Sequence, residues 1–209
     1  MRKIILASGS QRRNDIMEFL GIPFEVVQSD FPEEKVIWND FDNNPHDYVS
    51  TIAMGKALTV ASQFEDALVL AADTSVFLDG KVYNKPDNLN EARRTLQTLR
   101  GRKHDIVTGV VLIDTLTHQQ EMFTVKSSIE FLPFSDEQLE SYISTGESLG
   151  KAGAYAIQMG AKPFVKSVEG SMSNILGLPI EETVALLEKF DIPIDVDVKA
   201  IVDQHFTHR

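Results

Sequence analysis

The sequence predicts an α/β fold with a central mixed sheet flanked by helices. A short apolar strand at 4–6 runs through a Gly/Ser turn into an amphipathic helix. The continuous apolar run 67–72 is typical of a strand that is covered on both faces. Two long β-type runs, 104–114 and 121–132, are joined by a polar turn and look like an antiparallel pair. A sheet that combines these elements is mixed.

Composition is that of an ordinary globular protein, with 209 residues, 43% hydrophobic and 24% charged. The net charge of −11 argues against a broad surface for nucleic acid or anionic membrane. A polyanionic partner would therefore be small and held by a local Arg/Lys cluster. The absence of cysteine excludes disulfides, catalytic thiols and zinc–thiolate sites. With neither a signal peptide nor an apolar segment of ~20 residues visible, we expect a cytoplasmic protein.

The opening stretch KIILASGSQRR combines features of an anion site. The turn Ala7–Ser10 leads into a helix that begins with Arg12 and Arg13 and carries Ile16 on its apolar face. Unpaired N–H groups and the positive end of a helix dipole meet at such a turn, and arginine forks suit phosphate oxygens. The alternative is an ordinary strand–helix unit with solvated arginines, since the sequence is not a P-loop.

A second strand is predicted over 24–27, and it precedes a long polar loop, 29–47, that carries Glu33. Such a loop is either functional or a mobile surface excursion. The following helix, 48–64, places Lys56 beside an apolar stripe. A lysine in this position usually extends to water, so we expect Lys56 to do so unless it belongs to a site.

Asp73 follows the buried run 67–72, and we expect the strand to end there. Ligands of open α/β sheets bind beyond the carboxyl ends of strands, which favours a functional Asp73 over one that merely caps the chain. A two-residue hairpin is predicted at Asp79-Gly80. The rigid turn 84–87 then presents Lys85.

The remaining elements follow from periodicity and caps. Helices are predicted at 91–100, at 135–144 behind a capping box, and at 180–190. Strands are predicted at 154–158 and 164–168, and loops at 145–153 and 170–179. Residues 191–209 show no helical face, and we expect a frayed end. The five histidines form no metal-binding pattern, so His104 is expected to be structural or solvated.

Cations and carboxylates thus fall together on predicted loops, without His or Cys clusters. This mixture suits a phosphorylated ligand bound through a hard divalent metal such as Mg²⁺, which prefers oxygen ligands. Metal and basic groups would balance the charge on phosphate oxygens, while a carboxylate orients or deprotonates water. The groups concerned are Arg12 with Arg13, Asp73 with Glu33, and Lys56 with Lys85.

An ordered set of motifs carries a family resemblance. The motifs are ASGSQRR (7–13), SDFPE (29–33), GKA (55–57), AADTSVFLDGKVYNKP (71–86), GRKHDIVTGV (101–110), KAGAYAIQ (151–158) and GLPIEET (177–183). From about residue 4 to 190 the chain resembles the Maf family of nucleoside triphosphate pyrophosphatases. The resemblance implies one domain over 1–190, with 191–209 as a C-terminal extension. It also implies a strongly twisted sheet of the Maf/ITPase-like type, two lobes with a cleft, and often a homodimer.

The implied activity is hydrolysis of a nucleoside triphosphate to the monophosphate and pyrophosphate, with Mg²⁺ or Mn²⁺, as a house-cleaning enzyme. By position, Asp73 resembles the family's proton acceptor, and Glu33 a carboxylate on the metal or water side, so that Glu33 and Asp73 are the expected metal ligands. The phosphate-gripping residues would be Ser8, Arg12, Arg13, Lys56 and Lys85.

Three positions bear on the nucleobase. A subgroup of the family that acts on dTTP and UTP matches at Arg12, Thr74 and Gln158, and Gln and Thr offer both donors and acceptors to a pyrimidine. The chain departs from the family pattern at Asn84, Gly150, Ala156 and Met159. These departures bear on which base is bound more than on the reaction.

A function of a different class is a nucleotide-binding regulator of cell division or septum formation that uses the same pocket without significant turnover. Both functions require nucleotide binding, but only the enzyme requires turnover that depends on Asp73. A kinase or GTPase is excluded by the lack of a phosphate loop followed by Lys-Ser/Thr.

Overall fold

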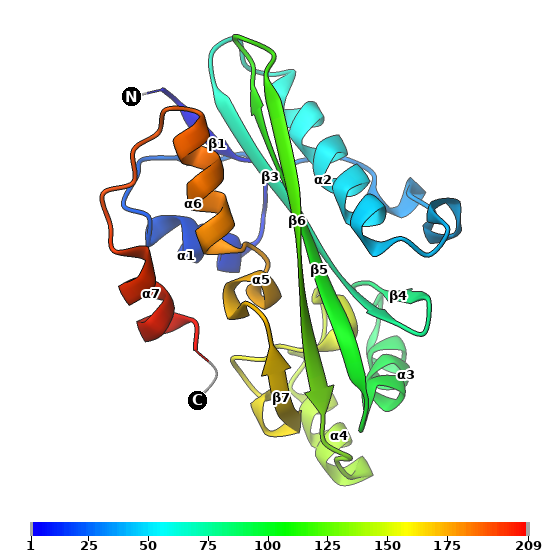
Figure 1. Ribbon diagram of the computed structural model, residues 1–209. Coiled ribbons are helices and arrows are strands. Elements are labelled where there is room, and N and C mark those ends of the chain that lie inside the picture. The colour runs from blue at the N-terminus through cyan, green and yellow to red at the C-terminus, as the bar shows by residue number, and fades with distance from the viewer. Residues whose placement is uncertain (1, 208–209) are drawn as a thin grey trace. The chain divides into compact units, whose positions relative to one another are not determined.

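The computed structural model describes residues 2–207 (Figure 1). The strands are β1 (Ile4–Leu6), β2 (Glu25–Val26), β3 (Leu68–Leu78), β4 (Lys81–Tyr83), β5 (Lys103–Asp114), β6 (Gln120–Phe131) and β7 (Val165–Glu169). The helices are α1 (Gln11–Glu18), α2 (Pro45–Ala61), α3 (Leu89–Leu99), α4 (Asp136–Ser144), α5 (Met172–Leu176), α6 (Ile180–Lys189) and α7 (Val198–His205).

The chain folds into two compact units. The first comprises Met1–Thr74, Thr108–Val125 and Ser171–Arg209, and the second comprises Ser75–Val107 and Lys126–Gly170. The chain passes from one unit to the other within strands β3, β5 and β6, and again between Gly170 and Ser171. Within residues 2–207, no helix is long and apolar enough to cross a membrane.

Within residues 2–207 the sheet has seven strands, and it is mixed, as predicted. Its order is β2-β1-β3-β5-β6-β7, and β4 pairs with β3. Strand β1 runs parallel to both β2 and β3, with Leu6 opposite Leu70. The pairs β3–β4 and β6–β7 are antiparallel. The predicted hairpin is also confirmed, because Leu78 pairs with Lys81 and both Asp79 and Gly80 have positive φ.

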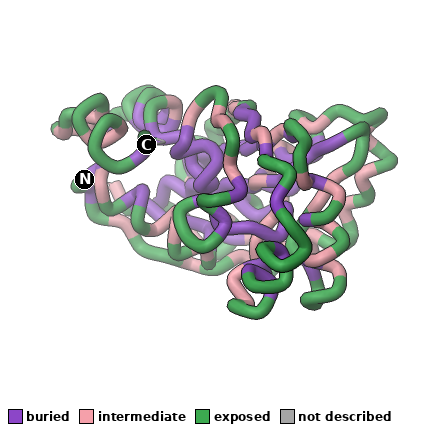
Figure 2. The backbone as a smooth tube through the Cα atoms, turned by 90° about the horizontal axis from the view of Figure 1, so that it is seen from below, coloured by how far each residue is buried: buried purple, intermediate pink, exposed green. Residues whose placement is uncertain are grey.

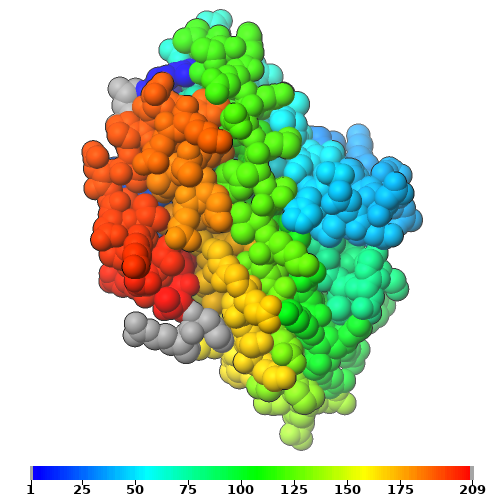
Figure 3. Space-filling view, in the orientation of Figure 1, coloured from blue at the N-terminus to red at the C-terminus, as the bar shows by residue number. Residues whose placement is uncertain are grey.

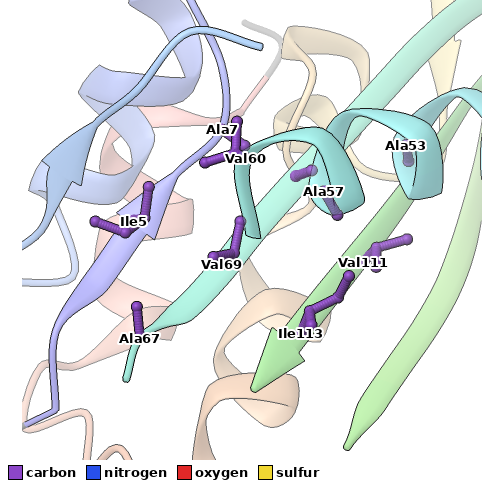
Figure 4. Packing of buried hydrophobic residues seen from close by; sticks show 10 residues of the cluster. Ile5, Ala7, Ala53, Ala57, Val60, Ala67, Val69, Val111 and Ile113 are labelled. Carbon is purple, nitrogen blue, oxygen red and sulfur yellow. The ribbon is translucent and has the colours of Figure 1, made fainter. Parts of the chain in front are cut away.

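The core of the first unit lies between α2 and the sheet (Figure 4). Alternate residues of β3, among them Val69 and Ala71, face Ala53 and Ala57 of the helix. Small side chains let the two elements approach closely: a Cβ at Gly109 of β5 would lie 3.0 Å from the backbone of α2. Burial of this apolar surface fixes α2, and hence Lys56, over β3.

The second unit is built on an aromatic core. The ring of Phe131 packs edge-on against His104, Tyr155 and Phe164, and Phe134 stacks on Phe164. His104 is 2% exposed, with its Nε2 atom 3.0 Å from the Tyr155 hydroxyl. Of the two roles expected for His104, the structural one is therefore confirmed.

Local sequence features predicted the ends of several helices and strands correctly. Helix α4 begins behind the predicted capping box, in which Ser135 and Gln138 each accept a hydrogen bond from the other's backbone N–H. Strand β7 and helices α3 and α6 also lie where they were predicted, within two residues at each end.

Several predicted elements were wrong. Strand β3 continues through Asp73 to Leu78 instead of ending at Asp73. Residues 154–158 are not a strand, because Gly153 and Ala154 adopt positive φ angles that break an extended chain. The loop predicted at 170–179 contains the short helix α5, which Ser171 caps through the N–H of Asn174.

Residues beyond 190 contain α7, where no helix was expected. Phe206, 6% exposed, packs edge-on against Phe19 at the end of α1. Figure 3 shows α6 and α7, in orange and red, side by side. Figure 2 shows burial along the described part of the chain, and α7 contains no buried residue. The rings that contact Phe19, His205 and Phe206, lie at the end of α7 and just beyond it, so the helix shows only a weak periodic signal in the sequence.

Burial of His104 makes stability depend on pH. Desolvation lowers the pKa of His104 from 6.5 to about 4. Between these values the unfolded chain binds a proton that the folded chain does not, so stability falls as the pH drops from 6.5 towards 4. The full effect is about 3 kcal/mol. In urea unfolding, the loss of stability caused by His104→Asn should shrink over this range, and His118→Asn, at an exposed turn, is the control for replacing a histidine. A loss that is constant with pH would contradict the assignment.

Candidate active site

The turn between β1 and α1 has the local form that the sequence predicts. The Ser8 side chain is buried, and its Oγ accepts the N–H of Ser10 at 3.2 Å. Helix α1 then begins directly after Ser10, with Arg12 and Arg13 half-buried in its first turn. The positive end of the helix and two guanidinium groups therefore lie at one turn, which is a suitable place for an anion.

Lys56 is buried and not extended into water, contrary to the usual behaviour of a lysine at such a position. Its side chain is 9% exposed. The Nζ atom lies 2.7 Å from Asp73 Oδ1 and 3.0 Å from Glu33 Oε1. An ammonium group shielded from water requires paired charge nearby. Two carboxylates provide it, so these three residues form one cluster.

Asp73 reaches this cluster from the middle of β3, not from its end. Side chains alternate across a strand, so Asp73 lies on the same face as Val69 and Ala71, the face that α2 covers. The strand continues because Thr74 and Ser75 are followed by Val76 and the apolar residues up to Leu78, which pair with β4. A buried carboxylate is tolerated within the strand because Lys56 neutralises it.

Glu33 is held in place by packing of its loop against α2. It lies in a short 3-10 turn, Glu33–Lys35, and its backbone N–H donates to the Phe31 carbonyl at 2.9 Å. The Phe31 ring lies directly over Gly55, where a Cβ would come within 2.3 Å of it. Gly55 therefore allows the aromatic ring, and with it the Glu33 loop, to approach the helix residue next to Lys56. This segment of the 29–47 loop is built into the cluster.

Arg13 is bonded to neighbouring chain segments. Its Nε donates to the Gly177 carbonyl at 2.7 Å, Nη1 to Ser8 Oγ at 3.2 Å, and Nη2 to Thr74 Oγ1 at 3.1 Å. Burial lowers the pKa of Arg13 below its ordinary value, and the charge of Asp73 acts in the opposite direction. Thr74 therefore meets Arg13, while its neighbour Asp73 meets Lys56.

Lys85 and Gln158 belong to the second unit. Lys85 is exposed in the turn after β4. Gln158 is exposed in a turn that follows the 3-10 segment Ala152–Ala154. Gly150 has a φ of 70°, and nothing lies within 4 Å of a Cβ built on it. The position therefore has room for a side chain, and aspartate tolerates this conformation better than most residues.

The carboxylate pair fits a divalent metal that is shared with a ligand. Residues 2–207 contain no group of three or more His, Cys, Asp or Glu side chains placed to hold a metal ion. Mg²⁺, however, is usually bound through one or two carboxylates together with waters and substrate phosphates. Asp73 and Glu33 supply that number of oxygen ligands at one place.

Several residues at this site were missed by sequence reasoning. Thr108 on β5 bonds both Thr74 and the Asn174 carbonyl, and the Gly177 carbonyl receives Arg13. Thr108 and Gly177 lie in the TGV and GLP segments that carried the family resemblance. Their presence in motifs was the available signal, but their partners are more than 30 positions away in the chain.

The family model described as "Maf-like protein" matches residues 3–190. The chain belongs to the Maf family. Curated Maf relatives named "dTTP/UTP pyrophosphatase" match nearly their whole length. The relative from Bacillus cereus (strain B4264) is 37% identical over 194 residues, covering 93% of this chain and 98% of its own. The relative from Clostridium botulinum (strain Eklund 17B / Type B) is 39% identical over 188 residues, covering 90% and 98%.

Another relative of the same name, from Pelotomaculum thermopropionicum, is 37% identical over 190 residues and covers 91% of this chain and 97% of its own. Among solved structures, the Ham1 protein of Staphylococcus aureus aligns with a TM-score of 0.44 at 16% identity, covering 63% of this chain and 73% of that one.

The packing of Phe31 on Gly55 gives a stability prediction. Gly55→Ala should destabilise the Maf domain by about 1–3 kcal/mol, because the added methyl group displaces the aromatic ring. Thr51→Ala, at an exposed position of the same helix, should change stability by less than about 0.5 kcal/mol. Urea unfolding measures both. In the double variant Gly55→Ala/Phe31→Leu, the smaller side chain should recover part of the loss. A Gly55→Ala protein as stable as the parent would contradict this packing.

Proposed function

We propose that this Maf protein hydrolyses nucleoside triphosphates, with dTTP and UTP as substrates, to the monophosphate and pyrophosphate. The observation that carries the proposal is the buried cluster of Lys56 with Asp73 and Glu33, in the same unit as the anion-binding turn at Ser8–Arg13. The relatives named dTTP/UTP pyrophosphatase support the same activity. The protein is accordingly a hydrolase acting on acid anhydrides.

The cluster supplies the parts that hydrolysis of a phosphoanhydride needs. Asp73 accepts a proton from water as the water oxygen attacks phosphorus, and the bond to the departing pyrophosphate breaks. Lys56 offers fixed positive charge to phosphate oxygens, and Arg12 with the N–H groups of the β1–α1 turn binds the phosphate chain. The resemblance implies Lys85 as a further phosphate-gripping residue. Each role makes use of charge that the residue already carries.

A divalent cation completes this proposal. Glu33 and Asp73 would hold Mg²⁺ or Mn²⁺ together with the substrate phosphates, and the ion would supply charge stabilisation and polarise phosphate oxygens. In that state Lys56 would remain beside both carboxylates, since three N–H donors let it contact a phosphate as well.

For the nucleobase, we propose that Arg12, Thr74 and Gln158 select a pyrimidine. Support comes from the family resemblance and from the names of the relatives, all of which specify dTTP and UTP. A homodimer remains a prediction that rests on the resemblance, and a cytoplasmic location remains a prediction from the sequence. Light scattering on the purified protein tests the first.

The function is tested by pyrophosphate release from dTTP, UTP, CTP, GTP and 7-methyl-GTP with Mg²⁺ or Mn²⁺. We expect fast release from dTTP and UTP, loss of release in EDTA, and recovery when the metal is returned. Asp73→Asn should lower turnover at least about 100-fold with little change in nucleotide affinity, because it removes the general base. Release from a different base alone would overturn the pyrimidine assignment. Nucleotide binding without release would support a regulatory protein instead.

Arg12 provides a separate test of the anion-binding turn. Arg12→Ala should raise KM for dTTP at least about tenfold, because a charge-assisted contact to phosphate is lost. Arg94→Ala, on α3 of the second unit and outside the proposed site, serves as the control for the loss of one positive charge. Steady-state kinetics at constant ionic strength measure both variants. Unchanged KM and kcat in Arg12→Ala would show that this turn does not bind the phosphates.

A further inference from the structure

We infer that Thr108 is a positioning residue for the anion-binding turn, and that Arg13 holds this turn in place without binding the substrate. The inference rests on the proposed function for its kinetic consequences. The structural basis is a chain of hydrogen bonds within the first unit, which we name the Arg13 relay: Arg13, Thr74, Thr108 and the carbonyl of Asn174.

Proton counting fixes the direction of the relay. A carbonyl only accepts, so Thr108 donates its single hydroxyl proton to Asn174 O, at 3.1 Å. Thr108 Oγ1 must then accept from Thr74 Oγ1, which is 2.9 Å away. A guanidinium only donates, so Thr74 in turn accepts from Arg13 Nη2 at 3.1 Å. The Gly177 carbonyl, 3.5 Å from Thr74 Oγ1, is too distant to compete for its proton.

The end of the relay formed by Thr108 and Asn174 is buried. Burial there opposes a reversal of the hydrogen-bond direction. Thr108 and Asn174 are both 0% exposed. A buried hydroxyl without its acceptor is costly, so Thr108 holds Thr74 in the orientation that accepts from Arg13. Thr108 thus acts on Arg13 through Thr74.

The guanidinium group of Arg13 donates hydrogen bonds to other protein groups. Three of its N–H donors go to Gly177 O, Ser8 Oγ and Thr74 Oγ1, each from a different nitrogen. These acceptors lie on the α5–α6 loop, the β1–α1 turn and β3. The guanidinium therefore links three segments that are distant in sequence. One of them, the turn at Ser8, supplies the N–H groups proposed to bind phosphate.

The loop that receives Arg13 is itself rigid. Ser171 Oγ accepts the Asn174 N–H, and Ser173 Oγ accepts the Ile180 N–H at 3.1 Å. Gly177 has a φ of 112°, and a Cβ there would lie 3.4 Å from Arg13 Nε. Both the backbone conformation and the contact with Arg13 favour glycine at this position. The relay thus ends on a fixed support.

Substitutions at Thr108 separate the hydroxyl from the shape of the side chain. Thr108→Val removes the hydroxyl at nearly constant volume and should raise KM for dTTP about tenfold, the usual scale for one lost buried hydrogen bond. The turn binds phosphate before and during the reaction, so kcat should stay within about twofold. Thr108→Ser keeps the hydroxyl and should restore KM. Thr183→Val is the matched control: Thr183 is equally buried and donates to the Pro179 carbonyl at 2.6 Å, but it lies outside the relay.

Arg13→Lys distinguishes a positioning residue from a phosphate contact. Lysine keeps the charge and binds phosphate well, but it cannot replace a fork bonded to three acceptors. We expect Arg13→Lys to raise KM at least as much as Thr108→Val. The double variant should be no worse than the poorer single variant, because both break one relay. An Arg13→Lys enzyme with the parental KM, or effects that multiply in the double variant, would overturn the inference.

Hydrogen exchange tests the relay without relying on activity. Thr108→Val should speed amide exchange in both 7–13 and 171–178, and Thr183→Val should leave 7–13 unchanged. Parental exchange in 7–13 for Thr108→Val would overturn the relay even if kinetics changed. If the parent protein releases no pyrophosphate from any nucleotide, the proposed function fails, and the exchange result alone decides whether Thr108 positions the turn.

Discussion

The buried ammonium group of Lys56 is the interaction on which the site depends. Two carboxylates hold it, at 2.7 and 3.0 Å, and they come from β3 and from the loop before α2. Removing one partner from a buried ion pair typically costs about 3–5 kcal/mol, because a charge is left uncompensated. The position of α2 over the sheet, the packing of Phe31 on Gly55 and the course of β3 are therefore coupled to one another through this charge balance.

The two faces of strand β3 carry side chains with different roles. Asp73 points to the face covered by α2, where it meets Lys56, while Thr74 bonds Arg13 and Thr108. Alternation along a strand makes this separation automatic for adjacent residues. A reactive carboxylate and the support of the phosphate-binding turn can thus sit one residue apart without competing for partners. This arrangement accounts for the need for Asp-Thr in the middle of a strand rather than at its end.

Features governed by local chemistry could be predicted from the sequence. The turn at Ser8, the hairpin at Asp79-Gly80 and the cap at Ser135 each depend on neighbouring residues, and each lies where it was predicted. Burial of Lys56 could not be predicted, because its partners Glu33 and Asp73 are brought together only by tertiary packing. For the same reason the continuation of β3 beyond Asp73 could not be predicted. A carboxylate after an apolar run resembles the end of a strand unless its counter-ion is known.

The most direct test of the Lys56 cluster as a catalytic unit is the single-turnover rate of dTTP hydrolysis in a double-mutant cycle. Asp73→Asn and Lys56→Met each leave one charge without its main partner, whereas the double variant removes both charges and should fold. If the two residues act together, the double variant will be about as slow as the slower single variant. Rate losses that multiply in the double variant would contradict a shared role, and a parental rate in Asp73→Asn would remove Asp73 from the reaction.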